Sequence, residues 1–167
     1  AFSSEDLIKG INVILTGQLT MSKITYKFEQ EFAKKLKAKY AVMVNSGSSA
    51  NLLATFASCN PLRKNKFKPG DEALIQSLCW PTSLWPLTQT GLKPIFVDVN
   101  PKSLNLDADV LLKKINSKTK VIMIIHVLGN SSNIEKIRNQ TKKRGIILIE
   151  DTCESLGARY KNKFLGT

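Results

Sequence analysis

The sequence has few of the residues that build metal centres or disulfide frameworks. Its 167 residues include one histidine and three cysteines, and Cys59, Cys79 and Cys153 lie far apart with no C-x-x-C spacing. Zinc sites and disulfide-stapled domains need such ligands in closely spaced sets. We therefore expect no metal site and no disulfide framework, and we interpret the cysteines as ordinary thiols.

Long hydrophobic runs are also missing. No apolar stretch approaches the roughly 20 residues that cross a bilayer, and the N-terminus, Ala1 to Asp6, lacks the basic-then-apolar order of a signal peptide. We expect a cytoplasmic protein with no membrane partner. Because the chain starts without methionine and closes abruptly at Gly166-Thr167, we also expect it to be a piece of a longer protein.

Negative charge is scarce relative to positive charge. The chain has 25 Lys and Arg against 13 Asp and Glu, a formal net charge of +12. The basic residues are scattered over predicted helices, without interleaved aromatics or a nucleic-acid motif. This pattern predicts a solvated lysine-rich surface, and no nucleic-acid partner, although an anionic substrate would be attracted by the same field. A nucleic-acid-binding domain is the last of our hypotheses.

Five short apolar runs rich in β-branched residues alternate with helix-like segments. The alternation predicts a mostly parallel sheet, and near-continuous apolar strands indicate that helices cover both faces. We therefore expect an α/β fold with a doubly wound sheet. The expected strands are 40–44, 73–76, 94–99, 120–126 and 146–150, and the expected helices are 26–38, 52–58, 107–115, opened by Asp107 as an N-cap, and 133–143.

A serine-rich turn, Asn45 to Asn51, joins the first expected strand to a helix. Gly47 lets the backbone approach an anion, the hydroxyl of Ser48 can donate to it, and the first free N–H groups of the helix point at it. The turn alone predicts a phosphate site only weakly, because a serine N-cap is also common in an ordinary strand-to-helix connection.

Further polar and aromatic residues follow the other expected strands. Because ligands of open α/β sheets bind outside the carboxyl ends of the strands, we expect them to gather at one edge with the serine turn. They are Trp80, His126, Asp151 and Glu154.

Each of these residues also has an ordinary structural interpretation. Asp151 is placed to cap a helix after its strand, Trp80 to lie in the core or at the rim before a helix begun by Pro81, and Glu154 to solvate a turn. His126, at the end of an apolar run, favours a buried hydrogen-bonded side chain over a catalytic one.

Six motifs, in their order and spacing, resemble the DegT/StrS family of PLP-dependent sugar aminotransferases and dehydratases. The similarity runs from about Gly17 to the end and is greatest with the 3-dehydratases of nucleotide-linked 4-keto-6-deoxy sugars. The motifs are Asn45-Ser46-Gly47-Ser48-Ser49-Ala50-Asn51-Leu52, Pro69-Gly70-Asp71-Glu72, Trp80-Pro81-Thr82, Gly91-Leu92-Lys93-Pro94-Ile95-Phe96-Val97-Asp98-Val99, Leu128-Gly129-Asn130 and Glu150-Asp151-Thr152-Cys153-Glu154-Ser155-Leu156-Gly157.

The resemblance implies an aspartate-aminotransferase-like (type I) fold that binds pyridoxal 5′-phosphate (PLP) or its amine form, PMP. It implies that Gly47 and Ser48 hold the phosphate, Trp80 stacks on the ring, and Asp151 pairs with the pyridine nitrogen. It also implies that Glu154 contacts the phenolic oxygen, where aminotransferases of the family usually have Gln.

The same resemblance divides the chain into an N-terminal segment, 1–25, and a partial PLP-binding large domain, 26–167. The lysine of aminotransferases, or the histidine that replaces it in the dehydratases, is expected beyond Thr167 with a small C-terminal domain. The catalytic residue is therefore unknown, and we expect the isolated fragment to be inactive.

The implied activity is C3 dehydration of a nucleotide-linked 4-keto-6-deoxy sugar for polysaccharide or lipopolysaccharide biosynthesis, in a homodimer with its site at the interface. Two alternatives stay open. One is a sugar aminotransferase of the same family, and the other is a non-catalytic binding or oligomerisation module that keeps the PLP fold.

Overall fold

The computed structural model describes residues 2–64 and 66–167. The chain divides into two compact units, of which the first extends to Met43 and the second runs from Val44 to Gly166. None of the described helices has both the length and the apolar character needed to cross a membrane.

The first unit contains two helices. α1 (Ser4–Leu15) begins with a capping box, in which the N–H of Asp6 donates to Ser3 Oγ and the N–H of Ser3 donates to the Asp6 carboxylate. α2 (Lys23–Leu36) contains Phe28 and Phe32, whose rings stack with centroids 5.4 Å apart. The helix expected over 26–38 is thus confirmed with shifted bounds, whereas α1 was not predicted.

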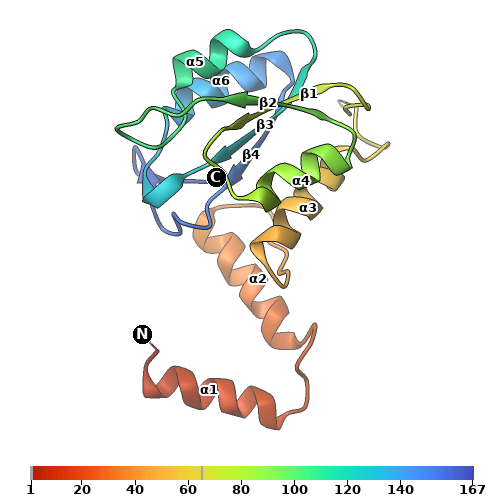
Figure 1. Cartoon of the computed structure of the whole chain (residues 1–167). Helices are drawn as coiled ribbons and strands as arrows, with labels where there is room; N and C mark the ends of the chain where they lie inside the picture. The colour runs from red at the N-terminus through yellow and green to blue at the C-terminus, as the bar shows by residue number, and fades with distance from the viewer. Residues whose placement is uncertain (1, 65) are drawn as a thin grey trace. The chain divides into compact units, whose positions relative to one another are not determined.

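The second unit is a parallel four-stranded sheet in the order β2-β1-β3-β4. Figure 1 shows α5 and α6 on one face of this sheet and α3 and α4 on the other. The predicted α/β class with a doubly wound parallel sheet is confirmed. The elements are α3 (Gly47–Ser58), β1 (Glu72–Gln76), α4 (Pro81–Gln89), β2 (Lys93–Val97), α5 (Ala108–Lys114), β3 (Thr119–Ile125), α6 (Ile134–Arg144) and β4 (Ile147–Asp151).

Each face of the sheet has its own hydrophobic core, because successive side chains of a strand point to opposite faces. On β3, Ile122 and Ile124 pack in the core that contains residues of α5 and α6. Val121 and Met123 pack in the other core, with Leu87 of α4. The near-continuous apolar sequence of β3 follows from its burial on both faces.

Local signals set where the helices begin and end. Asp107 caps α5 as predicted, with its Oδ1 atom accepting from the N–H of Asp109 at 2.8 Å. Gly145 ends α6 in the left-handed conformation, with φ of 65°. The helix expected over 52–58 begins earlier, at Gly47, because Ser46 is its N-cap and the serine turn itself forms the first helical turn.

The strand expected over 40–44 is wrong. This segment has no secondary structure, and the side chains of Tyr40 and Val42 are 74% and 69% exposed. A strand exists only where a neighbour pairs with it, and no strand of the described residues does so here. The N–H of Met43 instead donates to the Glu29 carboxylate at 2.7 Å. The segment 40–44 has the apolar composition of a strand, but no strand of the described residues pairs with it.

Two short elements in the second unit were not predicted. A 3-10 turn, η1 (Val127–Gly129), follows β3, and a small hairpin pairs β5 (Arg159–Tyr160) with β6 (Lys163–Phe164). The hairpin turn places Lys161 and Asn162 at φ of 46° and 65°. These are the conformations of a type I′ turn, which is usually signalled by Asn-Gly rather than by Lys-Asn.

Candidate functional site

A cavity of about 400 Å³ opens at the carboxyl edge of the sheet, within the second unit. The starts of α3 and α4 and the ends of β3 and β4 supply its walls. All five residues predicted to bind a cofactor line it, together with eight others, whereas His126 does not. The lining residues are Gly47, Ser48, Asn51, Leu78, Cys79, Trp80, Thr82, Ser83, Ile125, Val127, Asp151, Cys153 and Glu154.

Asp151, the last residue of β4, is the most constrained polar group of the cavity. Its Oδ2 atom accepts from Asn51 Nδ2 at 2.8 Å and from Ser83 Oγ at 3.1 Å. Its Oδ1 atom accepts from the N–H of Cys153 at 3.1 Å. No helix follows β4 directly, so the alternative interpretation of Asp151 as a helix cap is wrong.

Sequence reasoning assigned no role to Asn51 and Ser83. Both are polar residues in buried positions of amphipathic helices, with 8% and 1% of their surface exposed. Asn51 lies four residues after Gly47 and therefore shares its face of α3. A buried polar residue needs a partner, and this was the signal that could have drawn attention to Asn51 within the serine-rich motif.

Gly47 and Ser48 form the first turn of α3. Ser46 occupies the cap, because its Oγ atom accepts from the N–H of Ser49 at 3.2 Å. A Cβ atom added to Gly47 would meet no other atom within 4 Å, so the backbone is open on this side. A 12-residue helix that presents its first turn to a cavity is suited to an anion, through its unpaired N–H groups and its dipole.

Trp80 and Glu154 lie at the border of the cavity. Trp80 precedes α4, which Pro81 begins as expected, and its side chain is 73% exposed, so it belongs to the rim rather than to the core. Glu154 is exposed, and its Oε2 atom accepts from the N–H of Leu128 at 3.0 Å. Leu128 has a φ of 54°. Glu154 therefore stabilises an unusual turn and also lines the cavity.

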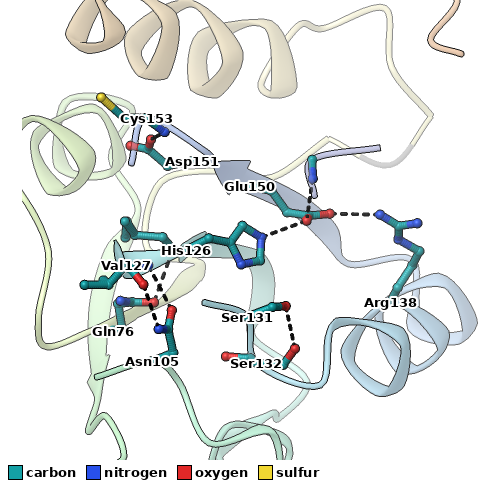
Figure 2. Close-up of polar contacts among 12 residues, drawn as sticks. Gln76, Asn105, His126, Val127, Ser131, Ser132, Arg138, Glu150, Asp151 and Cys153 are labelled. Atoms are coloured by element: carbon teal, nitrogen blue, oxygen red, sulfur yellow. Dashed lines mark hydrogen bonds and ion pairs between the residues drawn. The ribbon is translucent and has the colours of Figure 1, made fainter. Parts of the chain in front are cut away.

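His126 belongs to a separate buried cluster on the other face of the sheet (Figure 2). Its ring is fully buried, and Nε2 lies 2.9 Å from Glu150 Oε2. Arg138 Nη2 donates to Glu150 Oε1 at 3.0 Å, and the N–H of Gly166 donates to Oε2 at 3.0 Å. The interpretation of His126 as a buried hydrogen-bonded residue is confirmed.

Opposing effects act on the Glu150 carboxyl. Burial raises its pKa, but the hydrogen bonds from His126, the Gly166 N–H and Arg138 outweigh burial and hold the pKa below its usual value. Glu150 is therefore ionised inside the protein, where a cationic side chain compensates its charge.

The Cys79 thiol and the possible metal ligands bear on which reactions the cavity can support. Burial raises the pKa of the Cys79 thiol, which disfavours the nucleophilic thiolate. Across residues 2–64 and 66–167, no group of three or more His, Cys, Asp or Glu side chains is placed to hold a metal ion.

The arrangement suits a flat, phosphorylated heteroaromatic group. The first turn of α3 can bind the phosphate, and the exposed indole of Trp80 can cover a planar ring. A carboxylate has about four acceptor positions, and Asp151 uses three of them for Asn51, Ser83 and the Cys153 N–H. The remaining position on Oδ1 can accept a ring N–H.

Comparison with known protein families assigns nearly the whole chain to one family. The sequence profile of the DegT/DnrJ/EryC1/StrS aminotransferase family matches residues 3–167. A GDP-4-keto-6-deoxy-D-mannose 3-dehydratase of Yersinia pseudotuberculosis is 41% identical over 155 residues, which is 93% of this chain and 39% of that protein. The enzyme of the same description from Escherichia coli O55:H7 is 41% identical over 95% of this chain and 41% of that protein.

A solved structure agrees with this result. The E. coli GDP-4-keto-6-deoxy-D-mannose-3-dehydratase with bound hydrated PLP superposes with a TM-score of 0.87 at 40% identity, over 96% of this chain and 41% of that one. The chain thus spans about two fifths of the length of the proteins it matches.

Proposed function

Since this chain belongs to the DegT/DnrJ/EryC1/StrS aminotransferase family, we propose that it supplies the PLP or PMP site of a sugar-modifying enzyme. The reaction is removal of the C3 hydroxyl from a nucleotide-linked 4-keto-6-deoxy sugar, for polysaccharide or lipopolysaccharide synthesis in the cytoplasm. The dehydratases of Yersinia and E. coli that resemble the chain support this choice of substrate.

One observation carries the proposal: residues from four separate segments line a single cavity. The N–H groups and hydroxyl of the first turn of α3, at Gly47 and Ser48, bind the 5′-phosphate. Trp80 covers the ring, Asp151 pairs with the pyridine nitrogen, and Glu154 lies beside the phenolic oxygen. An acid at Glu154 favours the dehydratase over the aminotransferase.

The bound cofactor would supply an electron sink for the bond changes at the sugar. The residues of this chain prepare it for that role. The negative charge of Asp151 favours the protonated pyridine nitrogen, and Trp80 restricts the ring to one plane. The excess of basic residues, +12 overall, attracts an anionic nucleotide sugar.

Proton transfer at the sugar belongs to a residue outside this chain's matched motifs. In the dehydratase hypothesis this residue is a histidine, and in the aminotransferase hypothesis it is a lysine, in both cases after Thr167. We also propose that the enzyme is a homodimer in which a partner subunit completes the cavity.

Cofactor binding is tested on the chain itself. Titration with PLP is followed by quenching of tryptophan fluorescence, and we expect saturable binding that Asp151→Ala weakens. Asp98→Ala is the control, because Asp98 is also an aspartate at the carboxyl end of a strand but is exposed and does not line the cavity. Absence of saturable binding both to the wild-type chain and to the complete gene product would favour the non-catalytic module.

The reaction is tested on the complete gene product. PMP and GDP-4-keto-6-deoxymannose are supplied, and the product is identified by mass spectrometry. Replacement of the C3 hydroxyl by hydrogen, a net loss of one oxygen atom from the sugar with ammonia released, supports the dehydratase. Replacement of the C4 carbonyl oxygen by an amino group, with the C3 hydroxyl kept, supports the aminotransferase. PMP is converted to PLP in both reactions and supplies the electrons, so the sugar product distinguishes them.

A further inference from the structure

We infer that Asn51 and Ser83 are positioning residues, which hold the Asp151 carboxylate so that its Oδ1 atom faces the ring nitrogen of the cofactor. The inference rests on the proposed function, since it concerns the same cavity. It assigns a role to two side chains from different helices that touch Asp151 rather than the reacting sugar.

Side chains of α3 and α4 both donate hydrogen bonds to one oxygen atom of Asp151 at the end of β4. Asn51 on α3 donates to Asp151 Oδ2 at 2.8 Å, and Ser83 on α4 donates to the same atom at 3.1 Å. Asn51 Nδ2 also lies 3.3 Å from Ser83 Oγ, so the three side chains form a closed triangle. A carboxylate held in this way cannot rotate about its terminal bond without breaking two partly buried hydrogen bonds.

The two carboxylate oxygens are left with different capacities. Oδ2 has two donors and is filled, whereas Oδ1 has only the N–H of Cys153, at 3.1 Å, and keeps one acceptor position. The two helices therefore select which oxygen is available to a ligand. Without them, only the N–H of Cys153 would hold the carboxylate, and Oδ2 would also be open to a ligand. The orientation of the carboxylate would then have to be established when the cofactor binds.

The two donors to the Asp151 carboxylate are uncharged, and this affects the charge that a ligand meets. The Asn51 amide and the Ser83 hydroxyl are neutral, and no ion pair involving Asp151 occurs among residues 2–64 and 66–167. They orient the carboxylate without neutralising it. Its full charge remains to stabilise a protonated pyridine nitrogen, which a cationic neighbour would oppose.

The competing interpretation is that Asn51 and Ser83 only satisfy each other in a buried place between α3 and α4. Such a structural role affects every ligand of the cavity equally. A positioning role affects only ligands that have a ring nitrogen. The two interpretations are separated with PLP and with its analogue in which a C–H group replaces that nitrogen.

The experiment measures dissociation constants of both ligands for Asn51→Ala and Ser83→Ala. We expect PLP affinity to fall about five- to tenfold in each variant, while affinity for the carbon analogue stays within about twofold. The expected loss is smaller than the full value of a hydrogen bond to an ionised group, because the carboxylate and its second donor remain. Asn60→Ala is the control, because Asn60 is an exposed asparagine just after α3 and does not line the cavity.

A double-mutant cycle completes the test. In an Asp151→Ala background, Asn51→Ala should cause no further loss of PLP affinity, because the group it positions is gone. Equal losses for PLP and the analogue, or an undiminished effect of Asn51→Ala without Asp151, overturn the positioning role. If neither the wild-type chain nor the complete gene product binds either ligand, the proposed function itself fails. Thermal unfolding of each variant identifies one that has lost its fold.

Discussion

Two consecutive residues of β4, Glu150 and Asp151, place the same functional group in two different environments. Glu150 faces the α5 and α6 layer, where Arg138 and the ring of His126 contact it. Asp151 faces α3 and α4, where Asn51 and Ser83 contact it. The alternation of side chains along a strand accounts for the separation, and Figure 2 shows the two carboxylates directed apart.

The different surroundings of Glu150 and Asp151 show how the end of one strand contributes both to stability and to ligand binding. The Glu150 carboxylate is almost fully buried, with a guanidinium as partner, so its charge is compensated within the fold. The Asp151 carboxylate is held by neutral donors beside a cavity, so its charge is available to a ligand. We therefore expect changes at Glu150 to act mainly on folding and changes at Asp151 to act mainly on binding.

The largest expected effect on stability is that of Glu150→Ala. Removal of one partner from a buried ionic cluster leaves the others without compensation, which typically costs about 3–5 kcal/mol. Here Arg138 is partly exposed and can turn toward water, so we expect the lower end, about 3 kcal/mol, in the free energy of unfolding in urea. Glu5→Ala is the control, since its exposed pair with Lys9 contributes little. A loss at Glu150 no larger than that of the control contradicts the structural role.

Asp151→Asn should have a smaller effect on stability and a larger one on binding. The amide oxygen can still accept from Asn51 and Ser83, so we expect the free energy of unfolding to fall by only about 1 kcal/mol. Loss of the charge should weaken PLP binding about tenfold or more. Urea unfolding and a fluorescence titration on the same preparation give both values. A stability loss at Asp151 equal to that at Glu150 would remove the contrast between them.

The sequence predicted this edge of the sheet better than it predicted the contacts within it. Trp80 and Asp151 were found because each follows a buried run, and parallel strands bring their carboxyl ends together. Gly47 was found because it lies in a serine-rich turn before a helix, although the run before that turn is not a strand. The Asn51 and Ser83 contacts with Asp151 span 100 and 68 residues. No local pattern encodes hydrogen bonds at such separations, and only the packing of α3, α4 and β4 reveals them.

The same limit explains the wrong strand over 40–44. Composition predicts that a segment is able to form a strand, but pairing decides whether it does. The runs that became β1 and β3 have parallel neighbours on both sides, whereas the run at Tyr40 to Val44 has none among the described residues. Propensity was similar in all these segments, and tertiary context separated them.

The pH dependence of stability should report the contribution of the Glu150 carboxylate. The pKa of Glu150 in the folded state lies below its value of about 4.5 in the unfolded chain, because its hydrogen bonds outweigh burial. The folded state then binds fewer protons, so Glu150 contributes stability above about pH 4.5 that is lost as the pH falls below that value. Urea unfolding between pH 3 and 7 should show a flatter acid limb in Glu150→Gln than in the wild type. Parallel limbs would contradict this prediction.

The smallest expected change in stability is that of Trp80→Ala, which isolates the binding side of the comparison. The Trp80 side chain is 73% exposed, so its removal deprives the core of little, and we expect the free energy of unfolding to change by about 0.5 kcal/mol or less. PLP affinity should nevertheless fall, because a ring-stacking surface is lost. Trp85→Ala is the matched control, since Trp85 is also exposed and lies within α4, which Trp80 precedes, but is outside the cavity. Both variants keep one tryptophan, so residual fluorescence shows which indole PLP quenches. Stronger quenching of Trp85 than of Trp80 would place the ring outside the cavity and would remove the reason for assigning the Asp151 charge to a ligand.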